Sequence, residues 1–274
     1  MEIQEIKERF SADVVVVGGG PAGMCAAIAA ARAGADTLLL EQAGACGGMA
    51  TQGLVGPFMT CYDQRGENMI IRGLFEEIVN RMVARGYAIH PSQVRAGTAF
   101  TSWIVVGHDH VTPFEPEGLK LIMDEMLQEA GVKVLYHTTF LTPIVENGRL
   151  TAVTVASKSG IETVRGKVFI DCTGDGDVAV FAGCDYEKGR EDGLMQPVTV
   201  EFTLDDVEED KGILCIGDID NVEFRGQRFL DWTKAQAEQG IIPKNTAAVR
   251  LHPTVYKGSR QVNTTQVNGV DSTK

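Results

Sequence analysis

The chain has 274 residues, a length that suits one large domain or two modest ones. Its formal net charge of −12 at pH 7 argues against a surface for nucleic acid or anionic membranes. The 6 cysteines form no C-x-x-C pair and none lies beside a histidine, so no zinc or iron–sulfur site is indicated. We therefore expect no metal, no nucleic-acid partner and no membrane contact.

The N-terminal segment shows no targeting signal. Met1–Phe10 is charged and lacks the apolar stretch of a signal peptide, and the longest apolar runs elsewhere are interrupted by Gly, Arg or Asp. The sequence therefore predicts a cytoplasmic protein. We expect Met1–Ser11 to be a polar lead-in with one or two helical turns.

The most informative stretch is residues 13–23, Asp-Val-Val-Val-Val-Gly-Gly-Gly-Pro-Ala-Gly. The valines predict a short buried strand, and Met24–Ala33 predicts a helix directly after the glycines. Gly18 permits a tight turn, Gly20 lets the backbone approach a pyrophosphate, and Gly23 lets the helix lie close to the strand. The helix N-terminus would then present free N–H groups and its positive dipole end to the phosphates.

A second apolar run, Thr37–Leu40, ends in Glu41. An acid at this distance from Gly18 can hydrogen-bond a ribose hydroxyl, and it would repel a ribose 2′-phosphate, which disfavours NADP. The order of strand, glycines, helix, strand and acid indicates a nucleotide site. A purely structural βαβ unit that binds nothing remains the alternative.

The next segment begins with a glycine-rich loop at 42–56. Apolar residues at helical spacing predict helices over Arg72–Arg85 and Pro116–Ala130, and Gly131 is a natural end for the second. Between them, Ser102–Gly107 is the best candidate for a strand.

The following residues predict mainly strands. Val132–His137 is one strand, and Lys167–Cys172 is another that ends in Thr173-Gly174-Asp175. Turn signals at Asn147-Gly148 and Ser159-Gly160 separate three segments of a β meander. These segments are Phe140–Val145, Leu150–Ser157 and Glu162–Arg165. A short helix over Val178–Ala182 follows.

The segment from Gly193 onward predicts a further set of strands and helices. Val198–Leu204 alternates as a strand should, and the acidic run Asp205–Asp210 is expected to begin or cap a helix. Phe229–Gln239 predicts a helix, and the tail from Gln261 begins with a strand.

Four of these features together resemble the FAD-dependent oxidoreductases related to the fumarate reductase and succinate dehydrogenase flavoproteins. They are the G-x-G-x-x-G unit, the Gly47–Thr51 loop, the strand end Cys172–Asp175 and the segment Gly189–Pro197. The resemblance extends from about Ala12 to the C-terminus. Its motifs are specific for FAD and uninformative about the substrate.

The resemblance implies a set of cofactor-binding residues. For the pyrophosphate these are Gly18, Gly20, Pro21, Ala22 and Gly23. Glu41 would bind the adenosine ribose, with Gln42 beside it in the site. The loop near the pyrophosphate and the flavin ring is Gly47, Gly48, Met49 and Ala50. Backbone near Phe140 would meet the adenine. Cys172, Thr173 and Gly174 correspond to the family's Ala-Thr-Gly turn, with Cys172 in place of the usual alanine.

No motif identifies the catalytic acid or base. Arg250 and His252 are candidates, because they share one face of an alternating segment in the presumed substrate region, although surface or interdomain polar roles are the alternative. His108 and His110 flank Asp109, and we interpret them as a polar loop rather than a metal site, since no third ligand is identifiable.

The resemblance also exposes two departures from the family pattern. Such flavoproteins generally have a further C-terminal segment that completes the sheet and closes over the flavin ring, whereas this chain stops at Lys274. Relatives often have a basic residue where this chain has Gln266. We therefore expect a C-terminally truncated form, or one half of a split enzyme.

The expected fold is α/β, with a Rossmann-like FAD-binding parallel sheet, an inserted β meander and a smaller α+β substrate or cap region. The FAD-binding domain would comprise 12–56 and 113–190, and the cap 57–112 and 191–274, incomplete at its C-terminus. The expected function is hydride transfer between flavin and a small organic substrate.

Two alternatives to this function stay open. The chain could be a flavin-binding half-subunit or degenerate fragment that needs a second copy or a partner chain for its C-terminal half. It could also be an NAD-binding Rossmann protein, which fits the first glycine motif but fits the Gly47–Met49 loop poorly.

Overall fold

The computed structural model describes residues 6–95, 109–208, 223–246 and 251–271. The chain divides into two compact units, each built from two separate stretches of sequence. The first unit comprises Met1–Gln52 and Leu119–Glu187, and the second comprises Gly53–Gly118 and Lys188–Lys274. The assignment of FAD binding to one region and substrate binding to the other stays a prediction.

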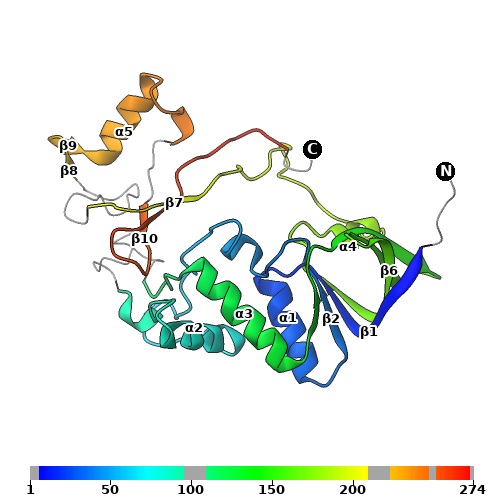
Figure 1. Ribbon diagram of the computed structural model, residues 1–274. Helices are drawn as coiled ribbons and strands as arrows, with labels where there is room; N and C mark the ends of the chain where they lie inside the picture. Colours follow the sequence, from blue (N-terminus) through cyan, green and yellow to red (C-terminus); the bar gives the residue numbers. More distant parts are fainter. Residues whose placement is uncertain (1–5, 96–108, 209–222, 247–250, 272–274) are drawn as a thin grey trace. The chain divides into compact units, whose positions relative to one another are not determined.

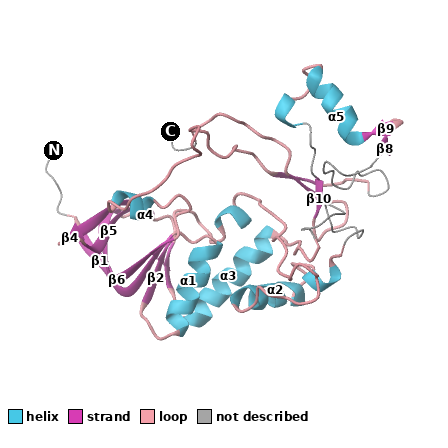
Figure 2. Ribbon diagram, turned by 180° about the vertical axis from the view of Figure 1, so that it is seen from behind, coloured by secondary structure: helices cyan, strands magenta, loops and turns pink. Residues whose placement is uncertain are grey.

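The first unit contains a six-stranded sheet in the order β3-β2-β1-β6-β5-β4 (Figures 1 and 2). Its strands are β1 (Lys7–Val17), β2 (Thr37–Leu40), β3 (Lys133–Leu135), β4 (Thr139–Glu146), β5 (Arg149–Ser157) and β6 (Gly160–Asp171). β1 pairs in parallel with both β2 and β6, and β2 pairs in parallel with β3. β5 runs antiparallel to β4 and β6. The predicted α/β fold with a parallel sheet and a β meander is confirmed, and β6 belongs to both parts.

Two details of this sheet differ from the prediction. β1 already begins at Lys7, so the helical turns expected up to Ser11 are wrong for residues 7–11. The reason is the length of β6, because its early residues, from Glu162 onward, pair in parallel with this segment. Arg9 also forms a 2.8 Å ion pair with Glu162. The two strands expected on either side of Gly166 form the single strand β6.

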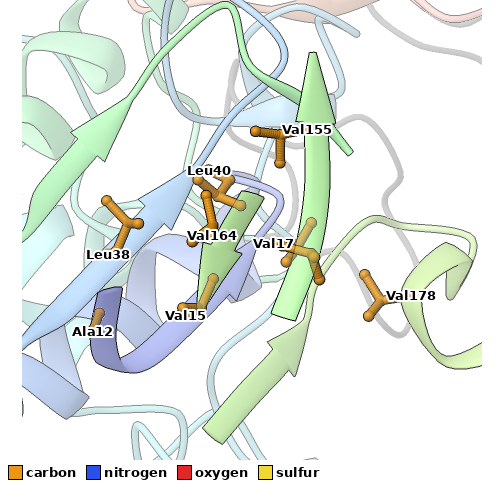
Figure 3. Packing of buried hydrophobic residues seen from close by; sticks show 9 residues of the cluster. Ala12, Val15, Val17, Leu38, Leu40, Val155, Val164 and Val178 are labelled. Carbon is orange, nitrogen blue, oxygen red and sulfur yellow. The ribbon is translucent and has the colours of Figure 1, made fainter. Parts of the chain in front are cut away.

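The hydrophobic core of this unit forms because successive side chains along a strand point to opposite faces of the sheet. Val15, Val17, Leu38 and Leu40 are buried on one face of the sheet, and Val178 joins them (Figure 3). The intervening residues of β1 and β2 are buried as well, as expected for parallel strands covered on both faces.

Three α-helices and one short 3-10 helix accompany the sheet. They are α1 (Pro21–Arg32), the 3-10 helix η1 (Gly48–Ala50), α3 (Pro116–Ala130) and α4 (Asp177–Phe181). α1 begins with proline at a position where its missing N–H costs nothing and continues in alanine, the best helix former. It packs on β1 and β2 and lies beside α3 (Figures 1 and 2). α4 packs on β4 and β6.

The second unit holds a three-stranded antiparallel sheet in the order β10-β11-β7. Its elements are α2 (Leu74–Ala84), η2 (Pro91–Gln93), β7 (Phe202–Leu204), β8 (Glu223–Phe224), β9 (Gln227–Arg228), α5 (Phe229–Glu238), η3 (Lys244–Thr246), β10 (Leu251–Pro253) and β11 (Arg260–Val262). None of the helices in the described ranges is long and apolar enough to cross a membrane.

The strand expected over Val198–Leu204 is shorter in the structure. β7 covers only its last three residues, because Val198 makes an isolated bridge to Val267 and the Val200 N–H donates to the Thr265 side chain. The acidic run is not helical over 205–208, and its remainder lies outside the described residues. The strand expected over 102–107 also lies outside them.

Candidate functional site

A cavity of about 370 Å³ lies in the first unit, where β1, β2 and β6 end at their carboxyl sides. It is lined by Val17, Gly18, Gly20, Pro21, Ala22, Leu40, Glu41, Gln42, Gly48, Met49, Gln52, Thr138, Thr139, Phe140, Cys172, Thr173, Gly174 and Asp177. Ligands of open α/β sheets bind at this edge, because the loops that follow parallel strands converge there. The cavity is therefore the candidate cofactor site.

The three motif glycines of the first turn differ in what surrounds them. A Cβ on Gly18, whose φ is +98°, would lie 2.2 Å from the Cys172 carbonyl oxygen, and one on Gly23 would lie 1.8 Å from the Gly18 carbonyl oxygen. These two glycines are therefore required by backbone packing. A Cβ on Gly20 would meet nothing within 4 Å, although Gly20 lines the cavity. The space left by Gly20 is thus available to a bound group.

Gly19 is a residue that the motif analysis missed. Its N–H donates to Glu41 Oε2 at 2.7 Å, and a Cβ there would lie 2.8 Å from that oxygen and 2.9 Å from Cys46 Sγ. The Ala43 N–H donates to Glu41 Oε1 at 2.7 Å. Glu41 is buried and lines the cavity, so main-chain donors hold its carboxylate in place. The only sequence signal for Gly19 was the run of three glycines.

The second glycine loop packs directly on the first. The Gly47 N–H donates to the Gly19 carbonyl at 2.8 Å, and a Cβ on Gly48 would lie 3.1 Å from the Gly20 Cα. Met49 is 65% exposed and lines the cavity. Ala50 is buried beneath the loop. Of the residues expected to bind the cofactor, Gly23, Gly47 and Ala50 lie outside the lining and support it.

The third turn follows β6 and is organised by Asp171, which the motif analysis also missed. Asp171 Oδ1 accepts from the Thr173 N–H at 3.0 Å and from the Thr173 hydroxyl at 2.8 Å, and Oδ2 accepts from the Ala179 N–H at 2.9 Å. The Thr173 hydroxyl oxygen in turn accepts from the Asp177 N–H. An acid at the end of a strand, two residues before a threonine, is the local signal that could have identified it.

The remaining wall comes from the start of β4. The Thr138 N–H donates to the Glu41 carbonyl at 2.9 Å, which fixes this wall to the end of β2. The ring of Phe140 stacks on Phe181 with centroids 6.2 Å apart, and Phe181 is 61% exposed. Phe140 lines the cavity, and an aromatic ring there provides a flat apolar surface suited to a base.

The charge around the cavity favours a bound anion at one point only. No Lys, Arg or His is among the lining residues that the structure describes. That point is the N-terminus of α1, which carries the positive end of the helix dipole. Its N-cap Gly20 makes no side-chain capping hydrogen bond and its first turn has no acidic residue, so neither offsets this positive end. Burial, followed by the Asp171 charge, raises the pKa of the Cys172 thiol, so it stays protonated at neutral pH.

These observations fit a dinucleotide. The uncapped helix end and the open space at Gly20 suit a pyrophosphate, and the immobilised Glu41 carboxylate suits a ribose hydroxyl. Most of the expected residues surround this one cavity, although their role in binding stays a prediction.

The catalytic candidates are not part of this cavity. Arg250 lies outside the described residues. His252 is buried in β10 of the second unit, opposite Gln261. His108 lies outside the described residues, whereas His110 Nδ1 is 2.9 Å from the Pro91 carbonyl and its ring stacks on Tyr62. Within the described ranges, no three His, Cys, Asp or Glu side chains are grouped to hold a metal ion.

Comparisons with known proteins give a matching family model and solved structures of similar fold. The model of the family described as FAD dependent oxidoreductase matches residues 13–274. A geranylgeranyl bacteriochlorophyll reductase-like protein from Thermoplasma acidophilum has 18% identity and a TM-score of 0.54, over 92% of this chain and 56% of that protein. CabE, an aromatic hydroxylase from angucycline biosynthesis, has 17% identity and a TM-score of 0.54, over 92% of this chain and 43% of that protein.

At such low identity, these two likenesses show the fold alone. The chain spans about half the length of the two solved structures. No curated protein matches it.

Proposed function

The chain belongs to the FAD-dependent oxidoreductase family, and from this premise we propose that its first unit binds FAD in the cavity at the carboxyl ends of β1, β2 and β6. We further propose that the bound flavin exchanges a hydride with a small organic substrate. The observation that carries the proposal is the open space at Gly20, directly at the uncapped N-terminus of α1. A side chain would fill the volume that a pyrophosphate needs.

The residues divide by the part of the cofactor that they would hold. The turn from Gly18 to Ala22 and the first N–H groups of α1 would bind the pyrophosphate. Glu41 would accept from the adenosine ribose hydroxyls, and its fixed charge would exclude a 2′-phosphate. Phe140 would lie beside the adenine, and Gly48 and Met49 would lie near the flavin ring.

FAD supplies the hydride chemistry itself, and the protein contributes binding, orientation and electrostatics. In this chain Asp171 holds the Thr173 turn through three hydrogen bonds, and Glu41 holds the first glycine turn to the end of β2. Both carboxylates therefore act by keeping the cavity wall rigid, and Cys172 adds a neutral thiol to that wall.

The proposal is tested by titrating the purified full chain with FAD and recording the visible absorption spectrum. Wild type should show a bound flavin spectrum and release FAD on denaturation. Gly20→Val should retain its fold, because nothing in the protein occupies the space, but weaken FAD binding at least tenfold. Ala29→Val adds similar bulk to an exposed position on the same helix and should bind FAD as wild type does.

Two results would overturn the proposal. One is a chain that stays colourless at saturating FAD. The other is a Gly20→Val protein that binds FAD as tightly as wild type. Tight binding of NADH, measured by its fluorescence, without FAD binding would favour the plain Rossmann alternative.

A further inference from the structure

Cys46 lies directly before the second glycine loop, and its side chain is fully buried. Its sulfur occupies the space between two segments that are far apart in the sequence. A Cβ added to Gly19 would lie 2.9 Å from Cys46 Sγ, so the thiol packs against the first glycine turn. The Tyr136 hydroxyl, directly after β3, hydrogen-bonds the same sulfur at 3.5 Å. The thiol therefore joins the first glycine turn to the end of β3.

The main chain at Cys46 connects this position to the cofactor cavity. The Cys46 carbonyl accepts from the Thr51 hydroxyl at 3.0 Å, and Gly47 donates its N–H to the first glycine turn at 2.8 Å. Gly48 follows and lines the cavity, where a Cβ on it would lie 3.1 Å from the Gly20 Cα. Because protein interiors are close-packed, a shift of the Cys46 side chain would also displace Gly48.

Tyr136 is held in turn by Asp124 of α3. The Tyr136 hydroxyl donates to Asp124 Oδ1. A hydroxyl has one proton and two lone pairs, so it can hydrogen-bond Asp124 and Cys46 at the same time. Burial raises the pKa of the Tyr136 hydroxyl, and the hydrogen bond to Asp124 raises it further. Burial also raises the pKa of the Cys46 thiol to about 11, so both groups are protonated at neutral pH.

We propose that Tyr136 is a positioning residue for cofactor binding. By holding the Cys46 thiol, it keeps the Gly48 backbone in place at the cavity. Asp124 contributes one step further out, because it holds the Tyr136 hydroxyl. None of these three side chains is among the described residues that line the cavity, so they act through the loop. The inference rests on the proposed function, since the role it assigns is in FAD binding.

A reactive role for the Cys46 thiol fits these observations less well. The thiolate is the reactive form, and at a pKa of about 11 almost none of it is present at neutral pH. The side chain also exposes no surface that a partner could reach. A general contribution to folding is the remaining alternative, and it predicts lower stability without a local change at the loop.

Titration of the full chain with FAD, below the melting temperature of every variant, tests the proposal. Tyr136→Phe keeps the ring and removes only the hydroxyl, and it should weaken FAD binding at least threefold. Tyr186→Phe is the matched control and should bind FAD as wild type does. It removes a hydroxyl from an exposed tyrosine of the same unit, outside the cavity lining.

Asp124 is tested by two substitutions that differ in one respect. Asp124→Ala removes the acceptor of the Tyr136 hydroxyl and should weaken FAD binding at least twofold. Asp124→Asn keeps an acceptor oxygen and should bind FAD as wild type does.

Labelling with iodoacetamide, without added FAD, reports on the loop itself. In Tyr136→Phe, Cys46 should be labelled at least threefold faster than in wild type, because the thiol has lost a hydrogen-bond partner and the loop opens more often. Cys25 in α1 reports on general opening of the first unit, and its labelling rate should not change. Mass spectrometry over time distinguishes the two sites.

Four outcomes would overturn the proposal. They are wild-type FAD affinity in Tyr136→Phe, equal losses of affinity in Tyr136→Phe and Tyr186→Phe, FAD binding by Asp124→Asn no better than by Asp124→Ala, and equally accelerated labelling of Cys46 and Cys25. A wild-type chain that stays colourless at saturating FAD is a different result, because it overturns the proposed function and this inference with it.

Discussion

Gly19 and Glu41 are joined by a hydrogen bond that leaves no room for a side chain. The Gly19 N–H donates to Glu41 Oε2 at 2.7 Å, and a Cβ on Gly19 would lie 2.8 Å from that same oxygen. The contact connects the turn after β1 to the end of β2. It also places the Glu41 carboxylate at a cavity whose described lining residues include no Lys, Arg or His.

Gly19→Ala should therefore damage the site even though position 19 is variable in the G-x-G-x-x-G pattern. Displacing Glu41 and Cys46 should cost about 1–3 kcal/mol of unfolding free energy, as overpacking usually does. Chemical denaturation measures this cost, and FAD titration should show weaker binding. Gly20→Ala is the matched control and should unfold as wild type does, since its Cβ meets no protein atom. Equal stability of the two variants would contradict this account.

Glu41→Ala should be more destabilising than Glu41→Gln. Alanine leaves the N–H groups of Gly19 and Ala43 without their acceptor, at about 1–3 kcal/mol for each buried donor, whereas glutamine retains one acceptor. Urea unfolding of the two variants checks the order. The account would be wrong if both lost the same free energy.

Asp171→Asn should loosen the turn after β6. The amide keeps one acceptor oxygen but turns an N–H₂ group toward a main-chain or hydroxyl donor, which should cost about 1–3 kcal/mol. Thermal unfolding measures the loss, and FAD titration should show weaker binding. Asp175→Asn, an exposed neighbour, should change both by little. Similar losses from the two substitutions would indicate a general effect of charge.

Glu201 should make the protein less stable as the pH rises. Burial raises the pKa of this carboxyl from 4.5 to about 7, and its Oε2 has no hydrogen-bond partner within the described residues. The folded state therefore favours the protonated form. The stabilisation is fully present below pH 4.5 and is lost as the pH rises through about 7.

Glu201→Gln mimics the protonated acid. It should stabilise the protein at pH 8 by about 1 kcal/mol, a value reduced for solvent screening of a half-buried group, and have little effect at pH 4.5. Thermal melts at the two pH values measure the difference. Glu208→Gln, on an exposed residue, is the control. The same effect at both pH values would contradict the assignment.

Cys46 should resist alkylation in the folded protein. Burial raises the pKa of its thiol to about 11, so at pH 8 only about one molecule in a thousand carries the reactive thiolate. Cys184 is exposed and should react with iodoacetamide first. Mass spectrometry over time distinguishes the two sites, and unfolded protein should label both quickly. Labelling of Cys46 in the folded chain as fast as Cys184 would show that the loop opens.

The sequence by itself determined the parts of this protein that depend on local rules. The valine run, the glycine spacing and the alanine-rich helix predict β1, the turn and α1, because turn geometry and helix propensity act within a few residues. The periodicity of residues 116–130 likewise predicted α3 with its observed bounds. Glu41 was identifiable because it directly follows a predicted strand at a characteristic distance from Gly18.

Only the tertiary structure decided which distant groups meet. The partners of Glu41 and the packing of Gly48 on Gly20 depend on how separate loops approach one another. β1 extends back to Lys7 because β6 lies beside it, although nothing local to residues 7–11 predicted a strand. In the second unit, β7 and β11 lie side by side because Thr203 and Gln261 pair across almost sixty residues of chain. Such pairings depend on contacts between segments, and a pattern within one segment carries no information about them.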